Sequence, residues 1–189
     1  MSTLQPQGRA TLYYWPSGRR GGRDVGHVAL LLADGTYVSH VPEMFKDSGH
    51  LSTWKRTDVP TMEGSIVKIT RWPSVRNRTL EADRRSYGDS PQTLQLPADF
   101  IHLYMAQQAS GRLLAQAPGA EPLHGPLPYY QLADSVKGAG DRSQCTTTVA
   151  SVLAAGVPLT HQDVGAEILA QYQPDALWDT VKALVSRFA

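Results

Sequence analysis

Runs of apolar and other strand-forming residues, bounded by Gly and Pro, predict several β-strands before residue 73. The segment 9–15, RATLYYW, consists mainly of strand-forming residues, and the segment 64–72, GSIVKITRW, has the same character. Between them, residues 25–42, VGHVALLLADGTYVSHVP, form two such runs around Asp34 and Gly35. Asp and Gly tolerate the positive φ of tight turns, so this segment predicts a β-hairpin. The pattern therefore predicts a sheet of at least four strands, mainly antiparallel.

The middle of the chain alternates less regularly. Residues 73–96 carry many charges and few apolar positions, which predicts a loop excursion. Residues 97–116 place apolar side chains at helical spacing and predict a helix. A Pro- and Gly-rich connector follows at 117–128, and the segment YYQLADSV at 129–136 predicts one or two helical turns.

The last third of the chain is predicted to be helical. Apolar residues after Cys145 follow helical spacing until Gly156, and the segment GVP then ends the helix. Thr160 and Asp163 resemble a capping box that opens a second helix through residue 169. An amphipathic pattern over 174–188 predicts a third helix.

Length and composition indicate a single globular domain over residues 1–189, and the order of the predicted elements, with the sheet first and the helices later, indicates the α+β class. Hydrophobic residues make up 41% of the 189 positions, and the formal net charge of +1 argues against nucleic acid as the main partner. No apolar run has membrane-spanning length, and the N-terminus lacks the layout of a signal peptide. We therefore expect a protein made in the cytoplasm, without stable membrane insertion, whose export would need a signal-independent machine.

Cys145 is the only cysteine, which excludes an internal disulfide and a cysteine-rich metal site. It falls in the first turn of its predicted helix, with Asp141 or Ser143 as the N-cap. Free N–H groups and the helix dipole favour negative charge there, so they lower the pKa of a thiol and stabilise an oxyanion. Cys145 is therefore a candidate nucleophile. The alternative is a buried cysteine that packs as a small hydrophobic residue.

A thiolate nucleophile needs a base, and His27, which opens a predicted strand after Gly26, is our candidate. With a two-residue turn at Asp34 and Gly35, His40 lies opposite Ala29 and shares one face of the hairpin with His27. His40 is then the group that orients His27. A turn with an odd number of residues would reverse this parity and remove His40 from that face. Structural roles for both histidines are the alternative. A metal site at the pair lacks a third ligand, and no cofactor is predicted.

A histidine that opens GHVALLLADGTYVSHVP, followed much later by a cysteine in QCTTTVASVLAAG, resembles the circularly permuted papain-like hydrolases. This is the NlpC-like superfamily, with its lecithin:retinol acyltransferase-like branch, and TLYYWP and YYQLADSV also resemble its bacterial members. The likeness covers roughly residues 9–42 and 129–158. Gln144 stands where the family has asparagine, and the two histidines are one residue further apart than in the acyltransferase-like branch.

The resemblance implies a small antiparallel sheet packed on the nucleophile helix, with Cys145 as nucleophile, His27 as general base and His40 as the third polar group. It also implies an amide-directed cysteine hydrolase (a protease, a peptidoglycan amidase or endopeptidase, or a protein deamidase) of the effector-toxin type. Peptides, peptidoglycan or proteins would be its substrates, an immunity protein its partner, and a type VI-like system its route of export. A lipid-directed acyltransferase or acyl hydrolase, and a non-catalytic binding protein of the same fold, remain the alternatives.

Overall fold

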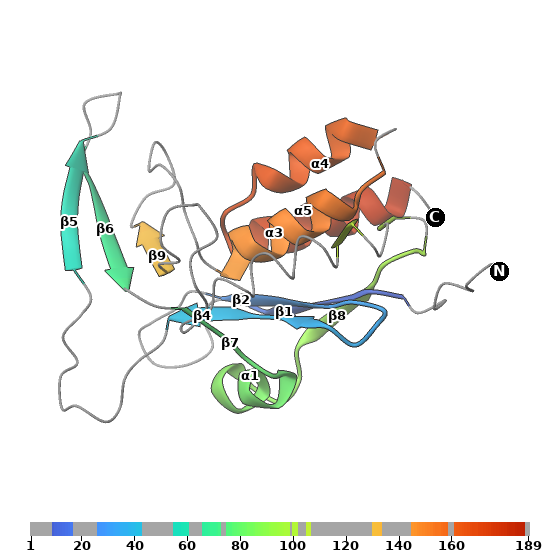
Figure 1. Cartoon of the computed structure of the whole chain (residues 1–189), viewed down its shortest axis with the longest axis horizontal. Helices are drawn as coiled ribbons and strands as arrows, with labels where there is room; N and C mark the ends of the chain where they lie inside the picture. The colour runs from blue at the N-terminus through green and yellow to red at the C-terminus, as the bar shows by residue number, and fades with distance from the viewer. Residues whose placement is uncertain are drawn as a thin grey trace.

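The computed structural model of the chain is a mixed α+β structure, shown in Figure 1. The residues that it describes are 9–16, 26–42, 55–60, 66–72, 75–98, 100–101, 105–106, 130–133, 145–158 and 161–187.

The main sheet has four antiparallel strands in the order β3-β2-β1-β8. Its two central strands are β1 (Thr11–Trp15) and β2 (His27–Leu31), and its edges are β3 (Tyr37–Val38) and β8 (Gln92–Gln95). The expected antiparallel sheet is therefore present with three of its predicted strands. Its fourth strand, β8, comes from a part of the chain where none was expected, and the segment 66–72 pairs in a separate sheet instead.

Two smaller sheets complete the described β-structure. In one, β4 (His40–Pro42) pairs with β7 (Val75–Asn77), and in the other, β6 (Ile66–Trp72) lies between β5 (Lys55–Pro60) and β9 (Tyr130–Ala133). The strand expected over 64–72 is confirmed. The helical turns expected over 129–136 are wrong for the described part, because pairing with β6 extends β9 as a strand.

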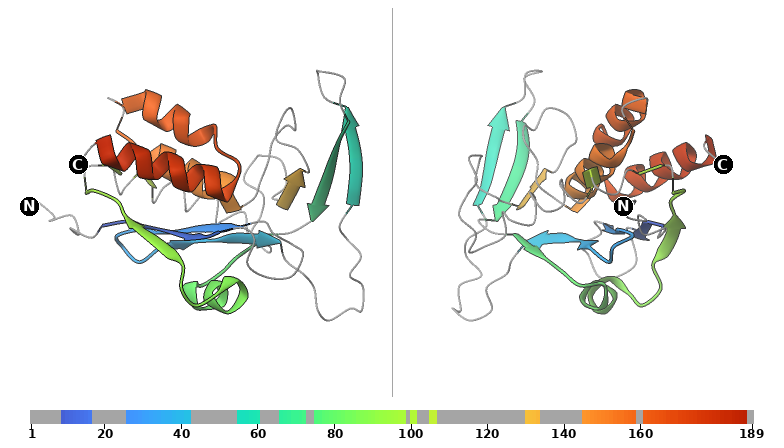
Figure 2. Two further views of the ribbon diagram at one scale, coloured as in Figure 1. Left: turned by 180° about the vertical axis from the view of Figure 1, so that it is seen from behind. Right: turned by 45° about the vertical axis from the view of Figure 1, so that its right-hand side comes forward.

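Helices cover both faces of the main sheet (Figures 1 and 2). On one face lie α3 (Cys145–Gly156), α4 (Gln162–Leu169) and α5 (Pro174–Arg187), which confirm the three helices expected in the last third of the chain. On the other face lies α1 (Leu80–Tyr87). His161 occupies the N-cap of α4 without a side-chain cap bond, and Thr160 lies outside the described residues.

Alternation along β1 and β2 divides the apolar side chains between these two faces. The even-numbered residues pack against the large helices, and each fully buried Leu or Val there contributes roughly 2 kcal/mol by leaving water. The odd-numbered residues pack on the side of α1. The first core includes Leu12, Tyr14, Val28, Leu30, Val149, Leu153, Leu177, Val181 and Leu184. The second includes Tyr13, Trp15 and Ala29, with Leu31, Tyr37 and Leu80 against them.

The loop predicted for residues 73–96 is wrong, because this segment forms β7, α1 and β8. Local signals explain the helix: Thr79 Oγ1 accepts a hydrogen bond from the N–H of Ala82, at 3.2 Å. Acidic residues occupy the first turn and basic residues the last, which suits the helix dipole. Gly88 ends α1 at a φ of 122°, a conformation that favours glycine.

The β2–β3 hairpin has a three-residue turn where a two-residue turn was predicted. Leu31 pairs with Tyr37, and the N–H of Leu32 donates to the carbonyl of Thr36, at 2.8 Å. Asp34 serves this turn, because its carboxylate accepts from the backbone N–H and the hydroxyl of Thr36. The odd turn reverses the parity of the following residues. Continued along the chain, this register places Ser39 opposite Ala29.

Only part of the helix expected over 97–116 falls within the described residues. Phe100 and Ile101 are buried in the main core, Ala106 is buried in a short helical stretch, and Met105 is exposed. The connector at 117–128 lies outside the described residues. No helix in the described ranges has both the length and the apolar character needed to cross a bilayer.

Candidate active site

Cys145 is the first residue of α3, and its thiol lies at the starting end of β2. The thiol is buried, with 5% of the residue exposed. It hydrogen-bonds with the His27 side chain and accepts from the backbone N–H of Val28. Thr146 Oγ1 lies 3.8 Å from the sulfur. The first turn of a helix and a strand N–H therefore both surround this sulfur with positive partial charge.

His27 is the first residue of β2, and its side chain points to the α1 face of the sheet. The residue is 1% exposed. Its ring stacks on the ring of Tyr87, with 4.3 Å between ring centroids and 13° between planes. The ring of Trp15 contacts the same imidazole in a tilted arrangement, with 5.6 Å between centroids. Since Cys145 comes from the opposite layer, the two groups meet around the end of the strand. Aromatic packing on His27 limits the rotation of its ring.

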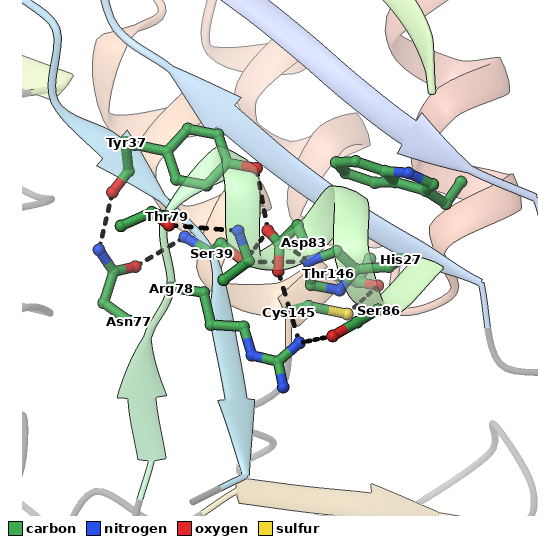
Figure 3. Close-up of polar contacts among 12 residues, drawn as sticks. His27, Tyr37, Ser39, Asn77, Arg78, Thr79, Asp83, Ser86, Cys145 and Thr146 are labelled. Carbon is green, nitrogen blue, oxygen red and sulfur yellow. Dashed lines mark hydrogen bonds and ion pairs between the residues drawn. The ribbon is translucent and has the colours of Figure 1, made fainter. Parts of the chain in front are cut away.

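Asp83, on α1, completes a cluster of polar groups around His27 (Figure 3). His27 Nε2 lies 3.3 Å from Asp83 Oδ2 and 2.9 Å from Ser39 Oγ. The hydroxyls of Ser39 and Tyr37 both donate to Asp83 Oδ2, at 2.5 and 2.9 Å. A single buried carboxylate oxygen, Asp83 Oδ2, thus hydrogen-bonds with the histidine and with two hydroxyl groups.

The electrostatics favour an ion pair between the thiol and the imidazole. Burial lowers the pKa of His27, but its hydrogen bonds to Asp83 and Cys145 and their charges outweigh burial and raise the pKa to about 9. Burial raises the pKa of the Cys145 thiol, but the bond and charge of His27 and the N–H of Val28 bring it below the usual value. Both shifts favour a thiolate beside an imidazolium over a neutral thiol beside a neutral ring.

Arg78 supports the same cluster from the residue before the N-cap of α1. Its Nη1 donates to Ser86 Oγ at 2.6 Å and lies 3.8 Å from Asp83 Oδ1. The pKa of Asp83 is raised by burial, but His27, Ser39 and Tyr37 bring it below the ordinary value. Asp83 is consequently a carboxylate at the pH values at which the His27 and Cys145 ion pair forms.

His40 does not orient His27, contrary to the expectation from the sequence. It belongs to β4, is 3% exposed, and has its Nδ1 3.1 Å from Thr148 Oγ1 on α3. The odd hairpin turn is the cause, because it turns His40 toward the large helices and leaves Ser39 on the face of His27. Burial lowers the pKa of His40 to about 4, so its ring is neutral at physiological pH.

Three residues of the site were missed from the sequence: Asp83, Ser39 and Tyr87. Thr79 as an N-cap before a run of helix-forming residues was a signal for α1. It does not distinguish the buried Asp83 from its exposed charged neighbours. Asp141, Ser143 and Gln144, which precede Cys145, lie outside the described residues.

The described ranges contain no group of three or more His, Cys, Asp or Glu side chains placed to hold a metal ion. Comparison of the chain with family models, with curated proteins and with solved structures found no match. The functional argument therefore depends on the arrangement of Cys145, His27 and Asp83.

Proposed function

We propose that this protein is a cysteine hydrolase that attacks an amide carbonyl, with Cys145 as nucleophile, His27 as general acid and base, and Asp83 as the orienting carboxylate. The hydrogen bond between the Cys145 thiol and the His27 ring carries the proposal. It joins the first residue of a helix to the first residue of a strand from a distant part of the sequence. Nucleophile, base and orienting group in series form the arrangement that thiol hydrolases need.

The reaction follows from this pair. The thiolate forms a bond to the carbonyl carbon, and the π electron pair moves to the oxygen, near the first turn of α3. When the carbon–nitrogen bond breaks, His27 gives its proton to the departing amine, which leaves a thioester on Cys145. His27 then takes a proton from water as the oxygen attacks, the carbon–sulfur bond breaks, and the acid is released.

The charge state of His27 favours an amide substrate. An amine leaves only when it is protonated, so amide cleavage needs a general acid that still holds its proton at neutral pH. A ring with a pKa of about 9 meets this need. We propose peptides, peptidoglycan stems or protein side-chain amides as the substrate class, on a circularly permuted papain-like fold.

Thiol labelling and a substrate panel test the proposal. Iodoacetamide should label Cys145 rapidly at neutral pH in the native chain and at least tenfold more slowly in His27→Ala. Peptidoglycan fragments, proteins and lipid esters, incubated with native protein and with Cys145→Ser, are then compared by mass spectrometry. Amide cleavage or deamidation that Cys145→Ser abolishes would support the proposal. Acyl transfer alone would identify the lipid-directed alternative. Slow alkylation of Cys145 together with no turnover of any substrate would indicate a binding protein.

A further inference from the structure

The hydroxyl of Ser39 lies between His27 and Asp83 (Figure 3). Its oxygen is 2.9 Å from His27 Nε2 and 2.5 Å from Asp83 Oδ2, whereas the direct distance from Nε2 to the carboxylate is 3.3 Å. The three residues are 0%, 1% and 0% exposed, for Ser39, His27 and Asp83 respectively. Each of the two hydrogen bonds through Ser39 is therefore shorter than the direct contact, and the serine connects the carboxylate to the imidazole alongside it.

Counting protons along this route fixes the direction of each hydrogen bond. A carboxylate only accepts, so the single hydroxyl proton of Ser39 is donated to Asp83. The serine oxygen can then only accept from His27, which requires a proton on Nε2. When His27 is neutral, the proton stays on Nε2, and Nδ1 is left as the basic nitrogen for the thiol.

We propose that Ser39 is a positioning residue that transmits the charge of Asp83 to His27 and fixes the ring tautomer in which Nδ1 serves Cys145. This inference rests on the proposed function and identifies a fourth member of its site. Asp83 and Ser39 together do what one side chain does in a simple triad. Because Ser39 does not touch the thiol, its effect is exerted through His27.

The backbone around Ser39 is held so that the hydroxyl has little freedom. Its N–H donates to Asn77 Oδ1 at 2.7 Å, and its carbonyl accepts from the N–H of Arg78 at 2.9 Å. Asn77 also donates to the carbonyl of Tyr37, at 2.8 Å. Asn77 therefore holds the backbone before Ser39 and Arg78 holds the backbone after it, so that the hydroxyl is positioned before substrate arrives.

The charged and titratable groups around His27 come from several elements. Asp83 and Cys145 act on its pKa directly, and Tyr87, Arg78 and Tyr37 lie against the ring or against Asp83. The Ser39→Ala substitution removes none of these groups. A shift caused by Ser39→Ala can therefore be assigned to the loss of the relay.

The pH profile of Cys145 alkylation tests the proposal without any substrate. In Ser39→Ala, the imidazolium loses its nearest acceptor, so the acid limb of the profile should move to higher pH. The rate at neutral pH should fall about tenfold, in keeping with the loss of a hydrogen bond to a charged group. Ser151→Ala is the matched control, since its hydroxyl donates only to the carbonyl of Thr147 within α3. A Ser39→Ala profile identical to that of native protein would overturn the relay.

A double-mutant cycle with Asp83→Asn shows whether Ser39 acts through Asp83. If it does, Ser39→Ala should cause little further loss in the Asp83→Asn background, whereas independent roles would give multiplied losses. Should Ser39→Ala fail to fold, nitrogen-15 NMR of histidine-labelled native protein, above the pKa of His27, decides the matter. A proton on Nε2 is expected, and a proton on Nδ1 would overturn the proposal. These readouts stand apart from amide turnover, so failure of the hydrolase proposal would be seen separately.

Discussion

The ring of Tyr87 covers the ring of His27 in a near-parallel stack, with 4.3 Å between centroids. Tyr87 is the last residue of α1 and Asp83 lies one turn earlier, so the same helix supplies both contacts. Tyr87 is 36% exposed, whereas Trp15, the other aromatic residue against His27, is 4% exposed. The stack thus keeps the His27 ring in place on the side that is nearer to solvent.

Replacing Tyr87 with alanine should loosen His27 and slow alkylation of Cys145 at neutral pH. An aromatic pair contributes about 0.5–1.5 kcal/mol, so a loss of up to roughly tenfold is expected. Tyr87→Phe retains the ring and should stay within about twofold of native protein. Equal losses in both variants would point to the hydroxyl rather than the stack.

Asp83→Ala should lower the free energy of unfolding by about 3 kcal/mol, because it leaves the hydroxyls of Ser39 and Tyr37 without their buried acceptor. Its folded pKa lies below the ordinary carboxyl value. The stabilisation is therefore present above that value and is lost as pH falls. Urea titration at neutral pH measures the change. Asp89→Ala, at an exposed acidic position beyond α1, should change stability by less than about 0.5 kcal/mol.

Amide turnover should have a bell-shaped pH profile. The acid limb reflects formation of the thiolate, below the usual pKa of a cysteine, and the alkaline limb should lie near pH 9, where His27 loses the proton needed by the leaving amine. Alkylation of Cys145 should show only the acid limb, since iodoacetamide needs no proton. An alkaline limb near pH 6.5 would mean that His27 is not held as an imidazolium.

The interactions of His27 with Asp83 and Cys145 should also stabilise the fold over a defined pH range. Its folded pKa of about 9 is above the ordinary value of 6.5. Its contribution is therefore complete below pH 6.5 and is lost as pH rises through 9. Thermal unfolding across this range measures it. His27→Gln should flatten this part of the curve, and an unchanged slope would contradict the assignment.

His40 should affect stability in the opposite sense. Its folded pKa of about 4 lies below the ordinary 6.5, so unfolded chains bind its proton first, and the fold loses up to roughly 3 kcal/mol between pH 6.5 and pH 4. His40→Leu should reduce this acid sensitivity and leave Cys145 rapidly alkylated at neutral pH. A variant that keeps its stability but loses the reactive thiol would restore His40 as a candidate for the site.

Strong local signals predicted much of the fold. The hairpin at Asp34 and Gly35 and the helix from Cys145 depend on turn chemistry and on apolar spacing, which a single sequence displays directly. The meeting of Cys145 with His27 was expected from the residue types and from the family resemblance. Their catalytic roles remain predictions.

The polar cluster around His27 was harder to predict, because it depends on one residue in a turn and on burial. A three-residue turn exchanges Ser39 for His40 on the relevant face, and sequence alone gives both turn lengths similar support. Asp83 stands among charged residues that stay exposed, and only the packing of α1 under the sheet removes it from water. The register of the hairpin and the burial of Asp83 therefore determine which polar groups surround His27, and the sequence pattern does not show either of them.

The layered origin of the site has a consequence for how the chain matures. Its imidazole comes from a strand, its carboxylate from the layer below and its sulfur from the layer above, so an unfolded polypeptide carries only an ordinary, sluggish cysteine. The electrostatic surroundings that lower the thiol pKa exist only once α3 has packed on β2, so the rate of Cys145 alkylation during refolding would report when that packing forms.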